Sequence, residues 1–148
     1  MVNLEFQKTI RGLQLKFTRF YAHFLSKQKL TFPQFALLSI AYHEGSVQMS
    51  SFAKRMMISL PAVTHLVDRL ERAGFIRRTP HESDRRITLI KITSKGEKAV
   101  KQTQGVISEL FMGLFLGMPD REREIVQRFY IQFSKQIEEA LQKELRAK

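Results

Sequence analysis

The spacing of apolar residues changes twice along this chain of 148 residues. Up to Gly74 they recur every three or four positions, which is the period of an amphipathic helix. From Phe75 to Ile92 they recur every second position, which is the period of a strand, and beyond Thr93 the helical period returns. The sequence therefore predicts a mainly α-helical fold with one small β-hairpin, formed by strands at 75–79 and 87–92.

Four helices are expected before the hairpin, at about residues 4–29, 33–43, 49–57 and 60–73. Residues 33–43 are apolar on nearly every side, which is typical of a buried helix. Ser59 is a suitable N-cap for the fourth helix, and Pro61 is tolerated in its first turn. Two long helices are expected after the hairpin, at about 94–116 and from about 118 onwards.

The last helix carries an apolar residue at every fourth position: Ile125, Phe129, Phe133, Ile137, Leu141 and Leu145. The first helix has a similar stripe: Ile10, Leu13, Phe17, Phe20 and Phe24. A small middle domain cannot cover both stripes, so they predict a dimerisation layer and a homodimer. The expected organisation is an N-terminal dimerisation helix (1–30), a middle lobe (31–93) and C-terminal dimerisation helices (94–148).

Charge narrows the class of partner. The chain has 25 Lys and Arg against 14 Asp and Glu, a net charge of +11 and a pI near 10.3, above the level of about 9 that favours a nucleic-acid partner. Residues 49–93 are the most basic part, with nine basic and four acidic residues. Acidic proteins and anionic membranes also attract cations, so charge alone does not decide the partner.

Other classes are excluded or disfavoured by composition. The absence of Cys excludes a disulfide scaffold, thiol catalysis and thiolate zinc sites. The four His have no paired ligand spacing, and no metal or cofactor is expected. No apolar run approaches the roughly 20 residues of a membrane span, and the N-terminus is charged where a signal peptide is apolar. We therefore expect a cytoplasmic protein that is not an enzyme and does not bind a membrane.

The order helix, tight turn, helix and basic hairpin is that of a winged helix-turn-helix. The small Ala53 allows the two helices to approach, and Val63 fixes the second helix on the first. If the inner face is Val63, Leu66, Val67 and Leu70, the outer face consists of Pro61, Thr64, His65, Asp68 and Arg72, with Arg69 at its edge. The major groove of B-DNA admits one such helix, with its N-terminal half at the base edges.

Residues 31–99 resemble the MarR family of transcription regulators. The resemblance is carried by LTFPQF (30–35), ISLPAVTHLVDRLERAG (58–74), FIRR (75–78), DRR (84–86) and ITSKG (92–96). It implies a dimeric regulator of double-stranded DNA, with repression the expected mode, on a pseudo-palindromic operator. Release by a small-molecule effector of unknown identity is implied by the resemblance alone.

Several residues are expected to contact DNA. The resemblance places the guanidinium of Arg86 in the minor groove, where a planar cation suits the negative potential of a narrow A·T-rich groove. Arg85 is expected at a phosphate, and Thr64 and His65 at base edges. Arg69 is expected either at a phosphate or in an ion pair on its own helix. The remaining expected contacts come from Ser51, Lys54, Ser59, Pro61 and Ala62.

Asp84 has a different expected role, because its charge repels DNA. We expect it to pair with Arg77 or Arg78 on the hairpin strands and so to hold the tip in shape.

The chain departs from the family pattern at two places. Residues 60–62 are Leu, Pro and Ala where polar residues are usual, so readout there would rest on apolar contacts such as Ala62 with a thymine methyl group. Met57 stands where a turn glycine is common, which costs on the order of 1 kcal/mol if the position needs positive φ. The alternative interpretation is an architectural or protein-binding winged helix without sequence-specific readout.

Overall fold

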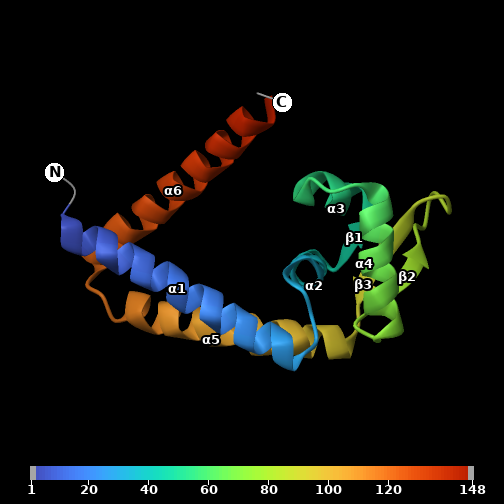
Figure 1. Cartoon of the computed structure of the whole chain (residues 1–148), viewed down its shortest axis with the longest axis horizontal. Coiled ribbons are helices and arrows are strands. Elements are labelled where there is room, and N and C mark those ends of the chain that lie inside the picture. Colours follow the sequence, from blue (N-terminus) through green and yellow to red (C-terminus); the bar gives the residue numbers. More distant parts are fainter. Residues whose placement is uncertain (1–2, 147–148) are drawn as a thin grey trace. The chain divides into compact units, whose positions relative to one another are not determined.

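The structure is a computed structural model that describes residues 3–146 and their side chains up to residue 144 (Figure 1). It contains α1 (Leu4–Lys27), α2 (Phe32–Glu44), β1 (Ser46–Gln48), α3 (Met49–Met56), α4 (Leu60–Arg72), β2 (Ile76–Pro80), β3 (Thr88–Ile92), α5 (Ser94–Leu116) and α6 (Asp120–Arg146). The chain divides into two compact units, the first ending at Val106 and the second beginning at Ile107. The predicted fold class, mainly helical with a small β-hairpin, is confirmed.

The sheet has one strand more than the sequence predicts. β2 and β3 pair antiparallel as expected, with Arg78 opposite Ile90. β1 pairs antiparallel with the other edge of β3, with Val47 opposite Ile90, so the strand order is β1-β3-β2. β1 is only three residues long, which is too short for an alternating pattern to be visible in the sequence.

The hydrophobic core belongs to the first unit. Its largest fully buried apolar side chains are Phe52, Leu37, Leu38, Leu70, Ile90, Val63, Val67 and Val100. They come from α2, α3, α4, α5 and β3, so the helices of the lobe share one core with the sheet. In the second unit, none of the side chains described in 107–144 is buried.

Gly96 is required where the first turn of α5 passes close to the chain entering β2. A Cβ atom at this position would overlap the carbonyl oxygen of Phe75 and lie 2.6 Å from Cγ1 of Ile92. The backbone N–H of Gly96 donates to Oγ1 of Thr93 at 3.2 Å, which fixes the turn in this place. The close approach therefore leaves no room for any side chain.

We expect Gly96→Ala to lower the free energy of unfolding by about 2–3 kcal/mol, because the added methyl group overpacks a site bounded by backbone. Urea denaturation at fixed protein concentration measures this change. Gly12→Ala is the matched control, since a Cβ at Gly12 meets nothing within 4 Å and alanine suits a helix better than glycine. Equal stability of the two variants would contradict the close approach.

Candidate nucleic-acid interface

Helix α4 divides into a buried and an exposed face, as the sequence predicts. The buried residues are Val63, Val67 and Leu70. Thr64, His65 and Arg69 are exposed. The hydroxyl of Thr64 donates to the carbonyl of Leu60 at 3.1 Å, which leaves the methyl group and the oxygen lone pairs of Thr64 available to a partner.

The N-terminal end of α4 is capped but otherwise apolar. Oγ of Ser59 accepts a hydrogen bond from the backbone N–H of Ala62 at 3.3 Å, which confirms Ser59 as the N-cap. Leu60 is 49% exposed, Pro61 is exposed and Ala62 is half-buried. Because residues 60–62 are apolar where the family pattern has polar residues, this end of α4 has an apolar surface beside the positive end of the helix dipole.

Met57 adopts the left-handed conformation between α3 and α4, with φ 54° and ψ 40°. Its backbone N–H donates to the carbonyl of Lys54, and the next residue, Ile58, donates to Ala53. This is the αL termination of a helix that glycine usually supplies. Position 57 therefore does require positive φ, which is the condition under which the sequence predicts a cost for methionine there.

We expect Met57→Gly to raise the free energy of unfolding by about 0.5–1 kcal/mol, since glycine relieves the left-handed strain at some cost in chain entropy. The side chain of Met57 is 47% exposed, so little packing is lost. Met56→Gly, one residue earlier within α3, should instead lower stability. Thermal denaturation of both variants measures the difference, and a loss of stability in Met57→Gly would contradict the assignment.

Helix α3 presents one cation free of carboxylates. Arg55 pairs with Glu44, with Nη1 and Oε1 at 2.5 Å, and the hydrogen bond that Arg55 donates to this carboxylate raises the pKa of Arg55. Within the described residues, Lys54 has no carboxylate within 4.0 Å and is exposed, whereas Ser51 is half-buried. Of these side chains, Lys54 is therefore the one best placed to meet a phosphate.

The tip of the β2–β3 hairpin is an ordered turn that carries two exposed arginines. The backbone N–H of Arg86 donates to Oδ1 of Asp84 at 2.9 Å, and Ile87 donates to the carbonyl of Asp84 at 3.0 Å. Arg85 and Arg86 are exposed, and within the described part of the chain neither has an ion pair. Asp84 thus holds the turn through the backbone and leaves both guanidinium groups free.

The expected pairing of Asp84 with Arg77 or Arg78 is wrong. Arg78 instead bridges two carboxylates of α4: its Nη2 lies 2.5 Å from Oδ1 of Asp68, and its Nη1 contacts Glu71. Glu71 also accepts the backbone N–H of Arg78 at 2.9 Å. The physical reason is that β2 runs beside α4, so the nearest carboxylates to Arg78 belong to the helix and not to the distant tip.

This bridge ties the hairpin to the helix. Partial burial lowers the pKa of Arg78, but the hydrogen bonds to Asp68 and Glu71 more than offset this and raise it above its ordinary value. The cation therefore stays charged throughout the working range of pH. Arg69 is exposed and has no ion pair among the described residues, so its guanidinium remains available on the exposed face.

The spacing of Asp68 and Glu71, three residues apart on one helix face, was the available signal for this bridge. This spacing alone does not show which basic residue of 75–86 pairs with the two carboxylates. The choice depends on the tertiary position of β2.

The site therefore combines an exposed helix face with a cationic turn on one lobe. Within residues 3–146, no group of three or more His, Cys, Asp or Glu is arranged to hold a metal ion. Among the helices of that same range, none is sufficiently long and apolar to span a bilayer. This arrangement defines a winged helix-turn-helix lobe with a basic, exposed face.

Comparison with known proteins shows a similarity to one family over part of the chain. Residues 30–88 match the model of the MarR family. YfiV of Bacillus subtilis (strain 168), described as an uncharacterized HTH-type transcriptional regulator, is 35% identical over 72 residues, which cover 49% of this chain and 45% of YfiV. The regulator MhqR of the same organism is 25% identical over 114 residues, covering 77% and 69% of the two chains. This chain thus spans about half of YfiV and about two thirds of MhqR.

Solved structures show the same fold. A MarR family protein from Bacillus stearothermophilus superposes with a TM-score of 0.70 at 22% identity, over 90% of this chain and 93% of that protein. A mutant of S. aureus MepR bound to an oligodeoxyribonucleotide gives a TM-score of 0.66 at 20% identity, over 89% and 97% of the two chains. Residues 30–88 are thus similar to the MarR family, and about nine tenths of the chain shares the fold of these two solved structures.

Proposed function

We propose that this chain is a homodimeric transcriptional regulator that binds double-stranded DNA in a sequence-specific way, with repression as its mode. The proposal rests chiefly on one observation: the exposed face of α4 and the Arg85–Arg86 turn belong to one lobe and leave their cations free of carboxylates. MepR, a structural neighbour, has been solved with an oligodeoxyribonucleotide, and MhqR is named as a transcriptional regulator. A regulator of this kind would act in the cytoplasm and have no enzymatic role.

Within the proposal, each expected contact has a place on the lobe. Thr64, His65 and the apolar end of α4 at Pro61 and Ala62 would face the base edges of the major groove. Arg86 would enter the minor groove. The contacts proposed for phosphates are those of Ser51, Lys54, Ser59, Arg69 and Arg85.

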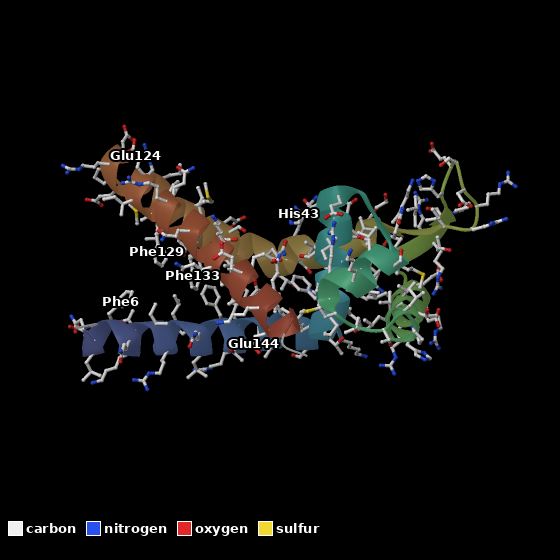
Figure 2. All side chains as sticks on the ribbon, turned by 90° about the horizontal axis from the view of Figure 1, so that it is seen from above. Phe6, His43, Glu124, Phe129, Phe133 and Glu144 are labelled. Carbon is white, nitrogen blue, oxygen red and sulfur yellow. The ribbon has the colours of Figure 1, made fainter. Side chains whose placement is uncertain are left out.

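The proposed dimer rests on apolar side chains that the single chain leaves exposed. On α6, Phe129 is 56% and Phe133 is 50% exposed; their rings stack at 5.8 Å and project from the same side of the helix (Figure 2). Leu145, the last expected member of the stripe, lies outside the described side chains. On α1, Phe6 is 54% exposed and Leu13 is 46% exposed. Burial of such stripes against a second copy is the common way to remove them from water.

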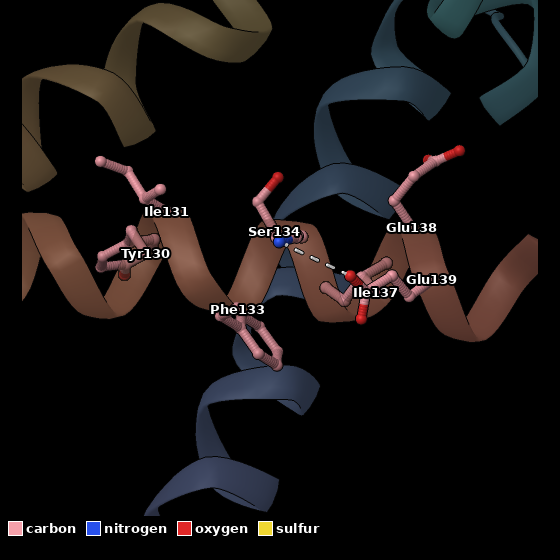
Figure 3. Close-up of a pocket in the computed structure, with 8 residues that line it drawn as sticks. Tyr130, Ile131, Phe133, Ser134, Ile137, Glu138 and Glu139 are labelled. Carbon is pink, nitrogen blue, oxygen red and sulfur yellow. Dashed lines mark ion pairs between the residues drawn. The ribbon is translucent and has the colours of Figure 1, made fainter.

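A shallow hollow on α6 lies in the same region. Its lining includes Ile131, Phe133 and Ile137, together with the pair Lys135 and Glu139, whose Nζ and Oε1 atoms lie 3.9 Å apart (Figure 3). Phe133 and Ile137 lie on one side of α6, whereas Ile131 points to another side (Figure 3), and an apolar side edged by charges is typical of a helix face that packs in an interface. We therefore include this face in the proposed dimerisation layer of residues 1–30 and 94–148.

A mobility-shift titration with a pool of random duplexes tests the function. Repeated recovery of bound DNA should yield one preferred sequence, and its affinity should fall steeply with salt, because phosphate contacts release counterions. Affinity that is equal for all duplexes would instead support an architectural role. No shift at low salt would overturn DNA binding altogether.

A further inference from the structure

A second basic site lies at the far end of α4 from the proposed DNA contacts. It is a hollow of about 390 Å³ between the end of α1, the residues that follow α4 and the first turns of α5, all within the first unit. At a rise of about 1.5 Å per residue, Ala73 lies roughly 20 Å along the helix from Ser59. The hollow is therefore separate from the face that would meet DNA.

Four lysines line this hollow: Lys27, Lys29, Lys95 and Lys98. No Asp or Glu lines it, and among the described residues none of these four ammonium groups has a carboxylate within 4.0 Å. Lys95 and Lys98 also lie at the N-terminal end of α5, where the helix dipole disfavours cations and favours anions. Four like charges around one hollow repel one another, and a bound anion would relieve that repulsion.

One of the four cations is held in place. Nζ of Lys95 donates to the carbonyl of Ala73 at 2.7 Å and lies 4.6 Å from the centre of the Phe75 ring. Phe75 also lines the hollow, so the site pairs an apolar wall with a positioned charge. A preorganised cation loses less side-chain entropy on binding than a freely moving lysine does.

A buried acceptor beside the hollow lacks a partner. Nε2 of Gln28 donates to the carbonyl of Ala99 at 3.3 Å and to Oγ1 of Thr103 at 3.1 Å, which fixes the orientation of the amide. Oε1 of Gln28 is buried and accepts no hydrogen bond from the described residues. Such an acceptor is ordinarily satisfied by water or by a ligand group. Gln28 lines the hollow, and because Oε1 is enclosed, the fixed amide contributes a preorganised part of the wall and not a contact to the ligand.

We propose that this hollow is a binding site for a small organic anion with at least two negative charges, such as a polycarboxylate or a phosphorylated metabolite. Its volume is within the range of about 300–1,000 Å³ that small-molecule sites occupy. The proposal does not depend on DNA binding, because none of the residues that form the hollow belongs to the proposed DNA contacts.

Calorimetric titration of the full chain with citrate, with inorganic pyrophosphate and with acetate, at neutral pH and constant ionic strength, tests the site. Citrate or pyrophosphate should bind, and acetate should bind much more weakly. Lys29→Gln combined with Lys98→Gln should weaken that binding by about tenfold or more, because two charge-assisted hydrogen bonds are lost. Lys95 is left unchanged in this variant because it also supports Ala73.

The matched control is Lys8→Gln combined with Lys16→Gln, which removes the same charge from exposed positions of α1 outside the hollow. This control should keep its affinity for the anion within about twofold of the parent protein. The proposed site would be overturned if the two double variants lost equal affinity for the anion, or if the parent protein bound neither citrate nor pyrophosphate.

Measuring DNA affinity shows whether the lysines of the hollow bind a small anion or instead contact the phosphates of the duplex. The two double variants should bind DNA equally well, since both lose two charges away from the proposed interface. A selective loss of DNA binding in Lys29→Gln with Lys98→Gln would assign the hollow to DNA and overturn the anion site. Failure of the parent chain to bind any duplex would contradict the proposed function and leave the calorimetric result standing.

Discussion

Arg86→Ala is expected to weaken binding of the preferred duplex by about thirtyfold, or roughly 2 kcal/mol, while the oligomeric state stays the same. The side chain is exposed, and its backbone N–H is held by Asp84, so the turn keeps its shape when the guanidinium is removed. The loss therefore reports the contact with DNA and not a change of fold. Fluorescence anisotropy with a labelled duplex measures it.

Arg121→Ala is the control for Arg86→Ala. Arg121 is exposed in the first turn of α6, and its replacement removes the same charge. It should change affinity only slightly, through the net charge. If Arg86→Ala and Arg121→Ala lose equal affinity, the assignment of Arg86 to the minor groove is wrong.

The second large effect is expected on α6. Phe129→Glu combined with Phe133→Glu should raise the dissociation constant of the dimer by roughly a thousandfold, because each phenylalanine is an aromatic anchor worth about 2 kcal/mol in such an interface. Both side chains are half-exposed in the single chain, so the substitution removes no core packing. Analytical ultracentrifugation should find monomers at micromolar concentration, with helical content by circular dichroism unchanged.

The control uses the other side of the same helix. At about 100° per residue, Gln127 and Gln142 point away from the side of Phe129 and Phe133, and neither lines the hollow on α6. Gln127→Glu combined with Gln142→Glu adds the same charge and should leave the dimer intact. A dimer that survives in the Phe129→Glu, Phe133→Glu variant would show that this face of α6 is not its interface.

Much of the lobe could be predicted from local pattern. The inner face of α4 is buried where the helical period of Val63, Val67 and Leu70 places it, because an apolar stripe must be covered. Ser59 caps the helix because a side-chain oxygen at that position reaches the backbone N–H groups of the first turn. The turn with Arg85 and Arg86 follows from two strands separated by polar residues.

What could not be predicted depends on tertiary position. The sequence offers Arg77 or Arg78 as the partner of Asp84, yet Arg78 pairs with Asp68 and Glu71, which the packing of β2 beside α4 brings nearer. The hollow at Lys29 and Lys98 joins segments some 70 residues apart, and no spacing in the sequence indicates that they meet. Charge patterns in a sequence identify cations, but the fold decides which carboxylates reach them.

The central claim is that two copies of this chain present their α4 helices and wings to one duplex. In a symmetric dimer of this class, the half-sites lie about one helical turn apart, about 10 base pairs from centre to centre. The most direct measurement is the affinity for the preferred duplex before and after insertion of about half a helical turn between its half-sites. We predict an inverted repeat as the preferred sequence, and reduction of binding to the non-specific level by the insertion, because the two half-sites then face opposite sides of the DNA. Full affinity after the insertion, or a preferred sequence with no internal symmetry, would contradict the claim.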